Sequence, residues 1–128
     1  MTVRIVQLGS DRAPDEGTRI GTVRRPPRGI AKQDFARLDF YDVWFPVLAP
    51  TAPTLKAAIP IRSDKQWAVF VRRFRAEMRA PAAAQALDVL AALSHHANFS
   101  VGCYCEDEAR CHRSLLRELL LARNALVA

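Results

Sequence analysis

The residues with the most chemical potential lie close together near the carboxyl end of the chain. Three cysteines, Cys103, Cys105 and Cys111, fall within nine residues, and His112 and Arg113 follow directly. An odd, clustered set of cysteines is poor material for a disulfide framework, which would connect distant segments. The cluster therefore indicates packing, metal binding or thiol chemistry in a reducing compartment.

A metal site is the first possibility, because Cys103, Cys105, Cys111 and His112 together make a Cys₃His set of the kind that holds zinc. On a strand, Cys103 and Cys105 would share one face. However, Cys-X-Cys is not the usual zinc-knuckle spacing, and the adjacent side chains of Cys111 and His112 would have to converge from different directions. The spacing therefore argues against a metal site, and we predict neither a bound metal nor a cofactor.

Thiol catalysis is the second possibility. A cysteine at a helix N-terminus beside His and Arg has a lowered pKa, and the thiolate is the nucleophile. Cys111 fits this description, with His112 as the base. Cys105 and Arg110 match the C-x₄-R spacing of rhodaneses, although the intervening residues 106–108 are acidic and would repel a thiolate. A thiol-dependent enzyme with Cys111 as nucleophile stays an alternative.

Anion binding is the function that the sequence favours. A strand that runs into a helix N-terminus offers free backbone N–H groups, and ligands bind at the carboxyl ends of parallel strands. Arginines follow a second predicted strand, so two basic loops would converge if the two strands are parallel. We predict a small anionic or phosphorylated ligand, with a nucleotide as one candidate, between Pro27-Arg28-Gly29 and Cys111-His112-Arg113, with Arg24 and Tyr104 completing the site. A purely structural role, in which His112 and Arg113 bond to backbone carbonyls, stays open.

An alternation of strands and helices must position these residues. Strands are predicted at 3–8, 18–24 and 98–105, with a further short strand between 40 and 60. Helices are predicted after the Ser63–Gln66 capping box, from Pro81 to about His96, and from about 111 to 123, with short helical pieces near 33–38 and 52–58. This order predicts one small three-layer α/β domain over residues 1–128, with a largely parallel sheet and helices on both faces.

Composition excludes several classes of protein. The chain has 128 residues, half apolar and a quarter charged, with a net charge of 19 − 13 = +6. That is too apolar for a disordered chain, and no uncharged apolar run approaches the ~20 residues of a membrane span. With no signal peptide visible, we expect a cytoplasmic protein without a membrane partner. A homo-oligomer stays open.

The positive charge comes mainly from arginine. Four arginines, Arg72, Arg73, Arg75 and Arg79, lie on one predicted helix, mostly off its apolar stripe. A basic face can hold nucleic acid or a protein partner, and such an interaction module is a further alternative. The chain has none of the common nucleic-acid-binding motifs, so the sequence disfavours that partner without excluding it.

Several short motifs resemble those of a known family. They are Gly17-Thr-Arg-Ile20, Pro27-Arg-Gly29, Ala36-Arg-Leu-Asp39, Leu48-Ala-Pro50, Phe74-Arg-Ala-Glu77 and the closing Cys111-His-Arg113. Their order and spacing, from about residue 4 to 123, resemble the YeaO-type branch of the bacterial family of domain of unknown function 488 (DUF488). The resemblance implies a compact α/β fold and a cytoplasmic bacterial protein, and it implies no activity. It also implies that the 27–29 and 111–113 loops act together. The chain departs from the family pattern at Val23, Pro26 and Cys105.

Overall fold

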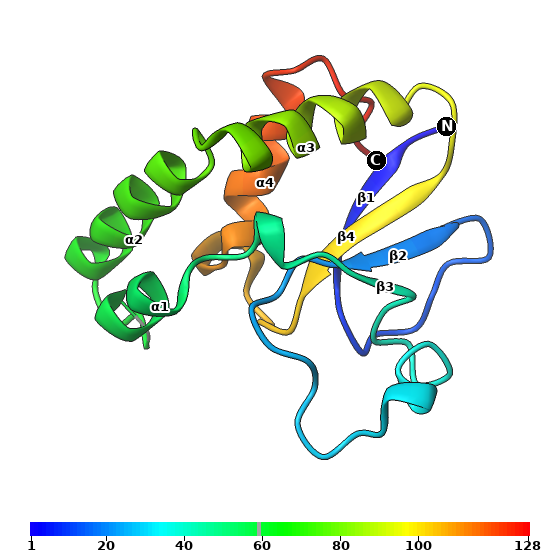
Figure 1. The fold of residues 1–128 in the computed structure, drawn as a ribbon, viewed down its shortest axis with the longest axis horizontal. Helices are drawn as coiled ribbons and strands as arrows, with labels where there is room; N and C mark the ends of the chain where they lie inside the picture. Colours follow the sequence, from blue (N-terminus) through cyan, green and yellow to red (C-terminus); the bar gives the residue numbers. More distant parts are fainter. Residues whose placement is uncertain (59) are drawn as a thin grey trace.

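A parallel sheet of four strands forms the centre of the protein (Figure 1). The computed structural model describes residues 1–58 and 60–128. The strands are β1 (Val3–Gln7), β2 (Thr18–Gly21), β3 (Val43–Trp44) and β4 (Phe99–Cys103), in the spatial order β1-β4-β2-β3. All the predicted strands are confirmed, including the short one between 40 and 60. The predicted α/β class with a largely parallel sheet is confirmed as well.

The described residues form four α-helices: α1 (Ala52–Ala58), α2 (Asp64–Glu77), α3 (Pro81–Leu93) and α4 (His112–Leu121). The start of α2 is fixed as the sequence predicts, because the Ser63 hydroxyl accepts a hydrogen bond from the backbone N–H of Gln66 at 3.1 Å. The Gln66 side chain reaches back one residue further than a capping box requires, and accepts from the N–H of Arg62 at 2.7 Å. Among the residues described, no helix has both the length and the apolar character needed to cross a membrane.

The α-helices pack against one face of the sheet. Val3, Ile5, Ile20, Phe99 and Val101 point from the strands into one apolar core, which also contains residues of α2, α3 and α4 such as Phe74, Leu87 and Leu116. The connection from β3 to β4 carries α1 to α3. The connection from β4 to the parallel bridge between Val127 and Val3 carries α4. Both connections move across the sheet in the same direction, so right-handed crossovers place their helices on the same face.

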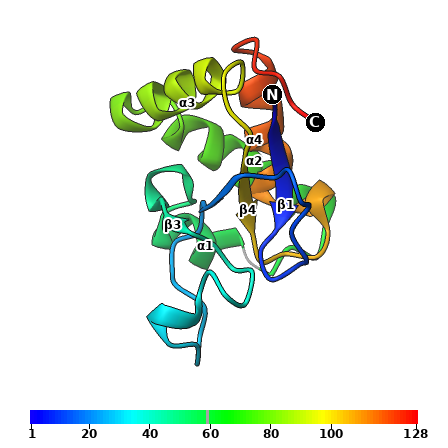
Figure 2. The ribbon, with the colours of Figure 1, turned by 90° about the vertical axis from the view of Figure 1, so that its right-hand side faces the viewer.

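The opposite face is covered by the connections that run the other way, residues 8–17 and 22–42. Tyr41 packs against Gly21 so closely that an added Cβ would lie 2.4 Å from its ring, and Phe40 packs against Gly9. The only helix in the described part of this layer is the short 3₁₀ helix η1 (Lys32–Asp34). The molecule therefore has three layers, but the second outer layer consists of loop and one 3₁₀ turn where the sequence predicted helices (Figure 2).

A buried ion pair fastens this loop layer to the sheet. Glu16 and Arg19 are 2% and 0% exposed, and the carboxylate accepts two hydrogen bonds from the guanidinium at 2.7 and 2.9 Å. Ser100 on β4 donates to the same carboxylate at 2.7 Å, and Arg19 also donates to the carbonyls of Ser10 and Asp39. Burial alone would raise the pKa of Glu16, but the hydrogen bonds from Arg19 and Ser100 outweigh burial and lower it. Sequence reasoning did not find this pair.

Candidate functional site

A pocket of about 480 Å³ opens at the carboxyl ends of β2 and β4. Three arginines line it from the segment after β2, and Cys103 and Tyr104 line it from the end of β4. The rest of the lining is apolar: Val23, Pro26, Pro27, Ile30, Phe40, Pro50 and Leu55. This volume falls within the range of small-molecule sites, which are typically apolar with a few placed polar groups.

The topology explains why a pocket forms there. β2 and β4 are hydrogen-bonded neighbours, but the chain leaves β2 toward the loop layer and leaves β4 toward α4 on the helix face. Connections that diverge from adjacent parallel strands leave a crevice at their carboxyl ends. Tyr104 bridges the two, since its hydroxyl donates a hydrogen bond to the carbonyl of Arg25 at 2.9 Å. Burial, with Tyr41 and Cys103 nearby, raises the pKa of Tyr104, which keeps this hydroxyl protonated and donating.

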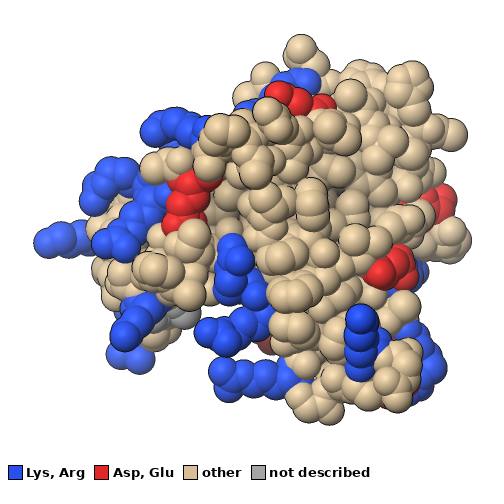
Figure 3. All heavy atoms as spheres, viewed as in Figure 1, with Lys and Arg blue, Asp and Glu red and all other residues tan. Residues whose placement is uncertain are grey.

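The three arginines of the pocket make different contacts. Arg24 is directed to the wall: its Nε donates to the carbonyl of Pro50 at 3.0 Å, and its Nη2 donates to those of Pro46 and Ala49 at 3.0 and 3.2 Å. Arg25 and Arg28 are exposed at the pocket rim. Figure 3 shows basic side chains bordering a hollow on this side of the molecule.

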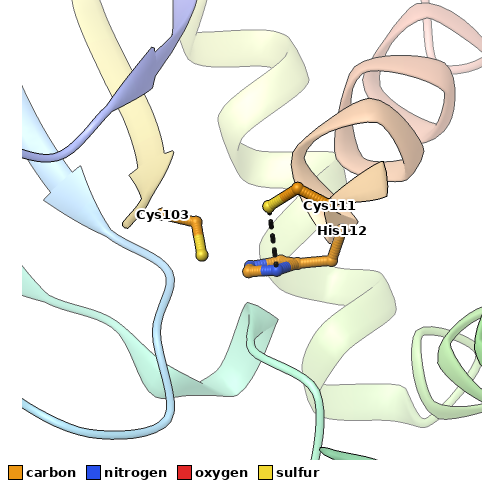
Figure 4. A group of neighbouring side chains, drawn as sticks. All are labelled: Cys103, Cys111 and His112. Atoms are coloured by element: carbon orange, nitrogen blue, oxygen red, sulfur yellow. Dashed lines mark hydrogen bonds between the residues drawn. The ribbon is translucent and has the colours of Figure 1, made fainter. Parts of the chain in front are cut away.

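Behind the pocket lies a buried cluster of Cys103, Cys111 and His112 (Figure 4). One ligand atom from each of these residues lies within 4.8 Å of the other two. Cys103 ends β4, Cys111 caps the N-terminus of α4 and His112 is the first residue of that helix. Cys103 also lines the pocket, so the cluster adjoins the pocket through this one residue.

The hydrogen bonds of His112 fix its tautomer. Its Nε2 lies 2.7 Å from the carbonyl oxygen of Thr22, and a carbonyl can only accept, so Nε2 carries the proton. In the neutral ring Nδ1 is then an acceptor. Nδ1 lies 3.8 Å from the sulfur of Cys111, and the ring packs against Phe74.

The three thiols interact with one another. Cys105 is exposed just beyond β4, and its sulfur lies 3.8 Å from that of Cys103. Hydrogen bonds from Cys103 and Cys111, together with the charge of Arg113, lower the pKa of Cys105. The interaction with Cys103 likewise lowers the pKa of Cys111, and the interactions with Cys105 and Cys111 raise the pKa of Cys103. The thiol that faces the pocket is therefore the one that best keeps its proton.

Arg113 is buried and serves the loop after β4. It is 4% exposed, and its Nη2 donates to the carbonyls of Cys105 and Glu106 at 2.6 and 3.5 Å. Its Nε is buried and has no hydrogen-bond partner among the described residues.

The structure thus distributes the predicted site residues over two adjoining places. Arg24, Arg28 and Tyr104 line the pocket, whereas Cys111, His112 and Arg113 are buried behind it. The predicted list of ligand-binding residues included neither Arg25 nor Cys103, both of which line the pocket. It also missed the wall residues Phe40 and Leu55, for which one sequence carries no signal because they arrive from distant segments.

A parallel sheet with its crevice at the carboxyl ends of the inner strands places the protein in the class of small α/β domains. Within that class, the chain belongs to the DUF488 family: the model DUF488-N3a, described as "Active DUF488-N3 subclade", matches residues 3–124. The family predicted from the sequence motifs is confirmed. Neither a curated protein nor a solved structure matches the chain.

Proposed function

We propose that the protein binds a small anionic or phosphorylated ligand with a flat apolar part, a nucleotide being one example, in the pocket between β2 and β4. The observation that carries the proposal is the lining itself, a mostly apolar cavity of about 480 Å³ with arginines at its rim. Arginine pairs with carboxylate and phosphate through two parallel hydrogen bonds. The apolar wall would accept the remainder of the ligand.

Within this site the residues have separate roles. Arg28 and Arg25, exposed at the rim, would bind the acidic group. Arg24 holds the wall through the carbonyls of Pro46, Ala49 and Pro50, and Tyr104 holds the backbone of Arg25. The predicted second half of the site takes a supporting role, because His112 and Arg113 donate to backbone carbonyls and fix the floor.

Two alternatives receive less support. The thiol predicted as a nucleophile, Cys111, is 2% exposed, and the thiol that reaches the pocket, Cys103, has a raised pKa. On the predicted arginine face, Arg75 is paired with Glu118 at 2.8 Å, and Arg72 and Arg79 line a separate pocket. The finer sequence-based expectations, a bacterial cytoplasmic protein of the YeaO-type branch, form part of this proposal.

The proposal is tested by titrating the protein with three probes and following backbone amide shifts by NMR. The probes are adenosine 5′-monophosphate, adenosine and inorganic phosphate. We expect the monophosphate to shift amides of residues 23–28 and 104 and to bind more tightly than either part alone. Arg28→Ala should weaken this binding about tenfold, equivalent to about 1.4 kcal/mol.

The matched control is Arg73→Ala, which removes an exposed arginine from α2 without touching the pocket. An equal loss in both variants would support nonspecific binding of polyanions and overturn the assignment. Absence of pocket shifts with all three probes at millimolar concentration would do the same for this ligand class.

A further inference from the structure

We propose that Cys103, Cys105, Cys111 and His112 form a binding site for a zinc-class divalent metal ion. The inference does not rest on the proposed anion binding, because it depends only on the four donor side chains, of which Cys103 alone lines the pocket. Three of the donors are already gathered, and the fourth, Cys105, is adjacent to Cys103.

The distances fit tetrahedral coordination. With Zn–S of about 2.3 Å and Zn–N of about 2.0–2.1 Å, neighbouring ligand atoms of a tetrahedral site lie roughly 3.5–3.8 Å apart. The sulfurs of Cys103 and Cys105 are 3.8 Å apart, and so are the Cys111 sulfur and His112 Nδ1. The Cys103, Cys111 and His112 donors lie within 4.8 Å of one another, whereas Cys105 lies outside that group and would have to turn its thiol from Cys103 toward the other donors.

The backbone removes the objection raised by the adjacency of Cys111 and His112. Neighbouring side chains diverge when both residues are helical, because successive positions are about 100° apart around the axis. Cys111, however, has φ −128° and ψ 152°, which is extended, and the helix begins only at His112. The change of conformation between the two residues turns their side chains toward the same point (Figure 4).

The surroundings also match those of a metal site. A metal-ligating histidine characteristically donates its other ring N–H to a backbone carbonyl or carboxylate, as His112 Nε2 does to Thr22. Three thiolates with one dipositive ion leave a net charge of −1, and Arg113 lies beside Cys105 to offset it. A buried free cysteine in a core behaves as a small apolar residue, and packing alone does not require two buried thiols beside an imidazole with a third thiol 3.8 Å from one of them.

The chemistry of the donors selects the metal. Thiolate and imidazole prefer borderline-soft ions, and a tetrahedral S₃N set is typical of zinc. With four protein ligands the site is closed, so the ion would tie the end of β4 to the start of α4 and stabilise the floor of the pocket. Exposed Cys105 provides the side from which the ion enters.

The test uses the full chain, reduced and freed of metal by a chelator, titrated with Co²⁺ alone and then with Zn²⁺. We expect one equivalent of Co²⁺ to bind with the d–d absorption of a tetrahedral site and a sulfur-to-cobalt charge-transfer band. Zn²⁺ should bleach both signals and raise the thermal midpoint, and chelator should reverse that rise. Lack of any stoichiometric Co²⁺ or Zn²⁺ binding by folded protein would overturn the proposal.

Variants identify the ligands. Cys105→Ser changes an exposed residue and should leave the fold intact, while the charge-transfer band falls by about one third as three thiolates become two. Cys111→Ser and His112→Ala should each weaken Co²⁺ binding by at least about tenfold. The matched control is His96→Ala, which changes an exposed histidine just beyond the end of α3 and should bind metal normally.

An unchanged cobalt spectrum in Cys105→Ser would remove Cys105 from the site. Equal loss in His96→Ala would indicate surface binding and contradict the whole assignment. Monophosphate binding measured with and without chelator separates this proposal from the anion pocket, because either can fail alone.

Discussion

Two buried polar clusters lie at opposite ends of β2 and β4. They differ in how good the hydrogen-bond partners of their polar atoms are. Near the amino ends of β2 and β4, Glu16 accepts short hydrogen bonds from Arg19 and Ser100, and Arg19 Nη1 donates to two carbonyls. At the carboxyl ends, the cysteine cluster leaves His112 Nδ1 facing a sulfur at 3.8 Å.

The difference separates a structural network from a candidate binding site. A buried polar group without a good partner costs free energy, so proteins rarely keep one without use. The Glu16–Arg19 network is complete and serves to hold the loop layer on the sheet. In the cysteine cluster the thiols and His112 Nδ1 have only long sulfur contacts of 3.8 Å as partners, and the metal ion proposed above would replace these with stronger bonds. On these proposals, the same strands contribute stability at one end and binding at the other.

The largest expected effect comes from breaking the complete network. Glu16→Ala leaves the Arg19 guanidinium buried without a counter-charge, which should lower the free energy of unfolding by about 3–5 kcal/mol. Urea unfolding measures this change. Asp15→Ala, which breaks the exposed Arg4–Asp15 pair, is the control and should cost less than about 1 kcal/mol. A similar loss of unfolding free energy in the two variants would mean that the Glu16–Arg19 pair does not hold the loop layer on the sheet.

A smaller effect is expected from the arginine beside the cysteine cluster. Arg113→Met removes hydrogen bonds to two carbonyls and also removes a buried Nε that has no partner among the described residues. We expect a loss of about 1–3 kcal/mol in metal-free protein. Arg19→Met leaves the Glu16 carboxylate uncompensated and should cost more. A larger loss of unfolding free energy in Arg113→Met than in Arg19→Met would mean that the cluster at the carboxyl ends, and not the Glu16–Arg19 network, contributes more to stability.

The third effect is a pH dependence of stability. The pKa of Glu16 is lower in the folded state than its unfolded pKa of about 4.3. Its ionised carboxylate therefore contributes to the unfolding free energy above the unfolded pKa, and this contribution is lost as pH falls through the folded-state pKa. Unfolding free energy should therefore decline below about pH 5 in the native protein. In Glu16→Gln the decline should be shallower, with a remaining slope from Asp42, whose pKa is lowered by Arg12 despite burial. Identical pH profiles for the two proteins would exclude Glu16 as the source.

The smallest effect concerns Tyr41, whose ring packs in the same cluster as Cys103 and Cys111. Its buried hydroxyl has no hydrogen-bond partner within the described chain. Tyr41→Phe should therefore leave unfolding free energy unchanged or raise it by up to about 1 kcal/mol. Tyr104→Phe, which loses a bond to the Arg25 carbonyl, should lower it by about 1 kcal/mol. A clear loss in Tyr41→Phe would show that the hydroxyl does find a partner in solution.

Local pattern accounts for most of the secondary structure. The Ser63 cap, Pro81 at the first turn of α3 and the apolar spacing of α2 are short-range signals that survive in the tertiary structure. The strands are shorter than predicted at their carboxyl ends, where residues after Gly21 and Cys103 diverge to opposite faces. That divergence follows from topology and has no local signal.

For the candidate site, the sequence by itself determined the inventory: a cluster of thiols beside His112, arginines after β2, and the strand ends that present them. Only the tertiary structure decided which of them share a pocket, because Phe40 and Leu55 reach it from distant segments. It also decided that Cys111 and His112 converge, through one extended residue at the start of α4. Helix and strand patterns repeat over a few residues and can be read locally, whereas burial and convergence depend on how connections cross the sheet.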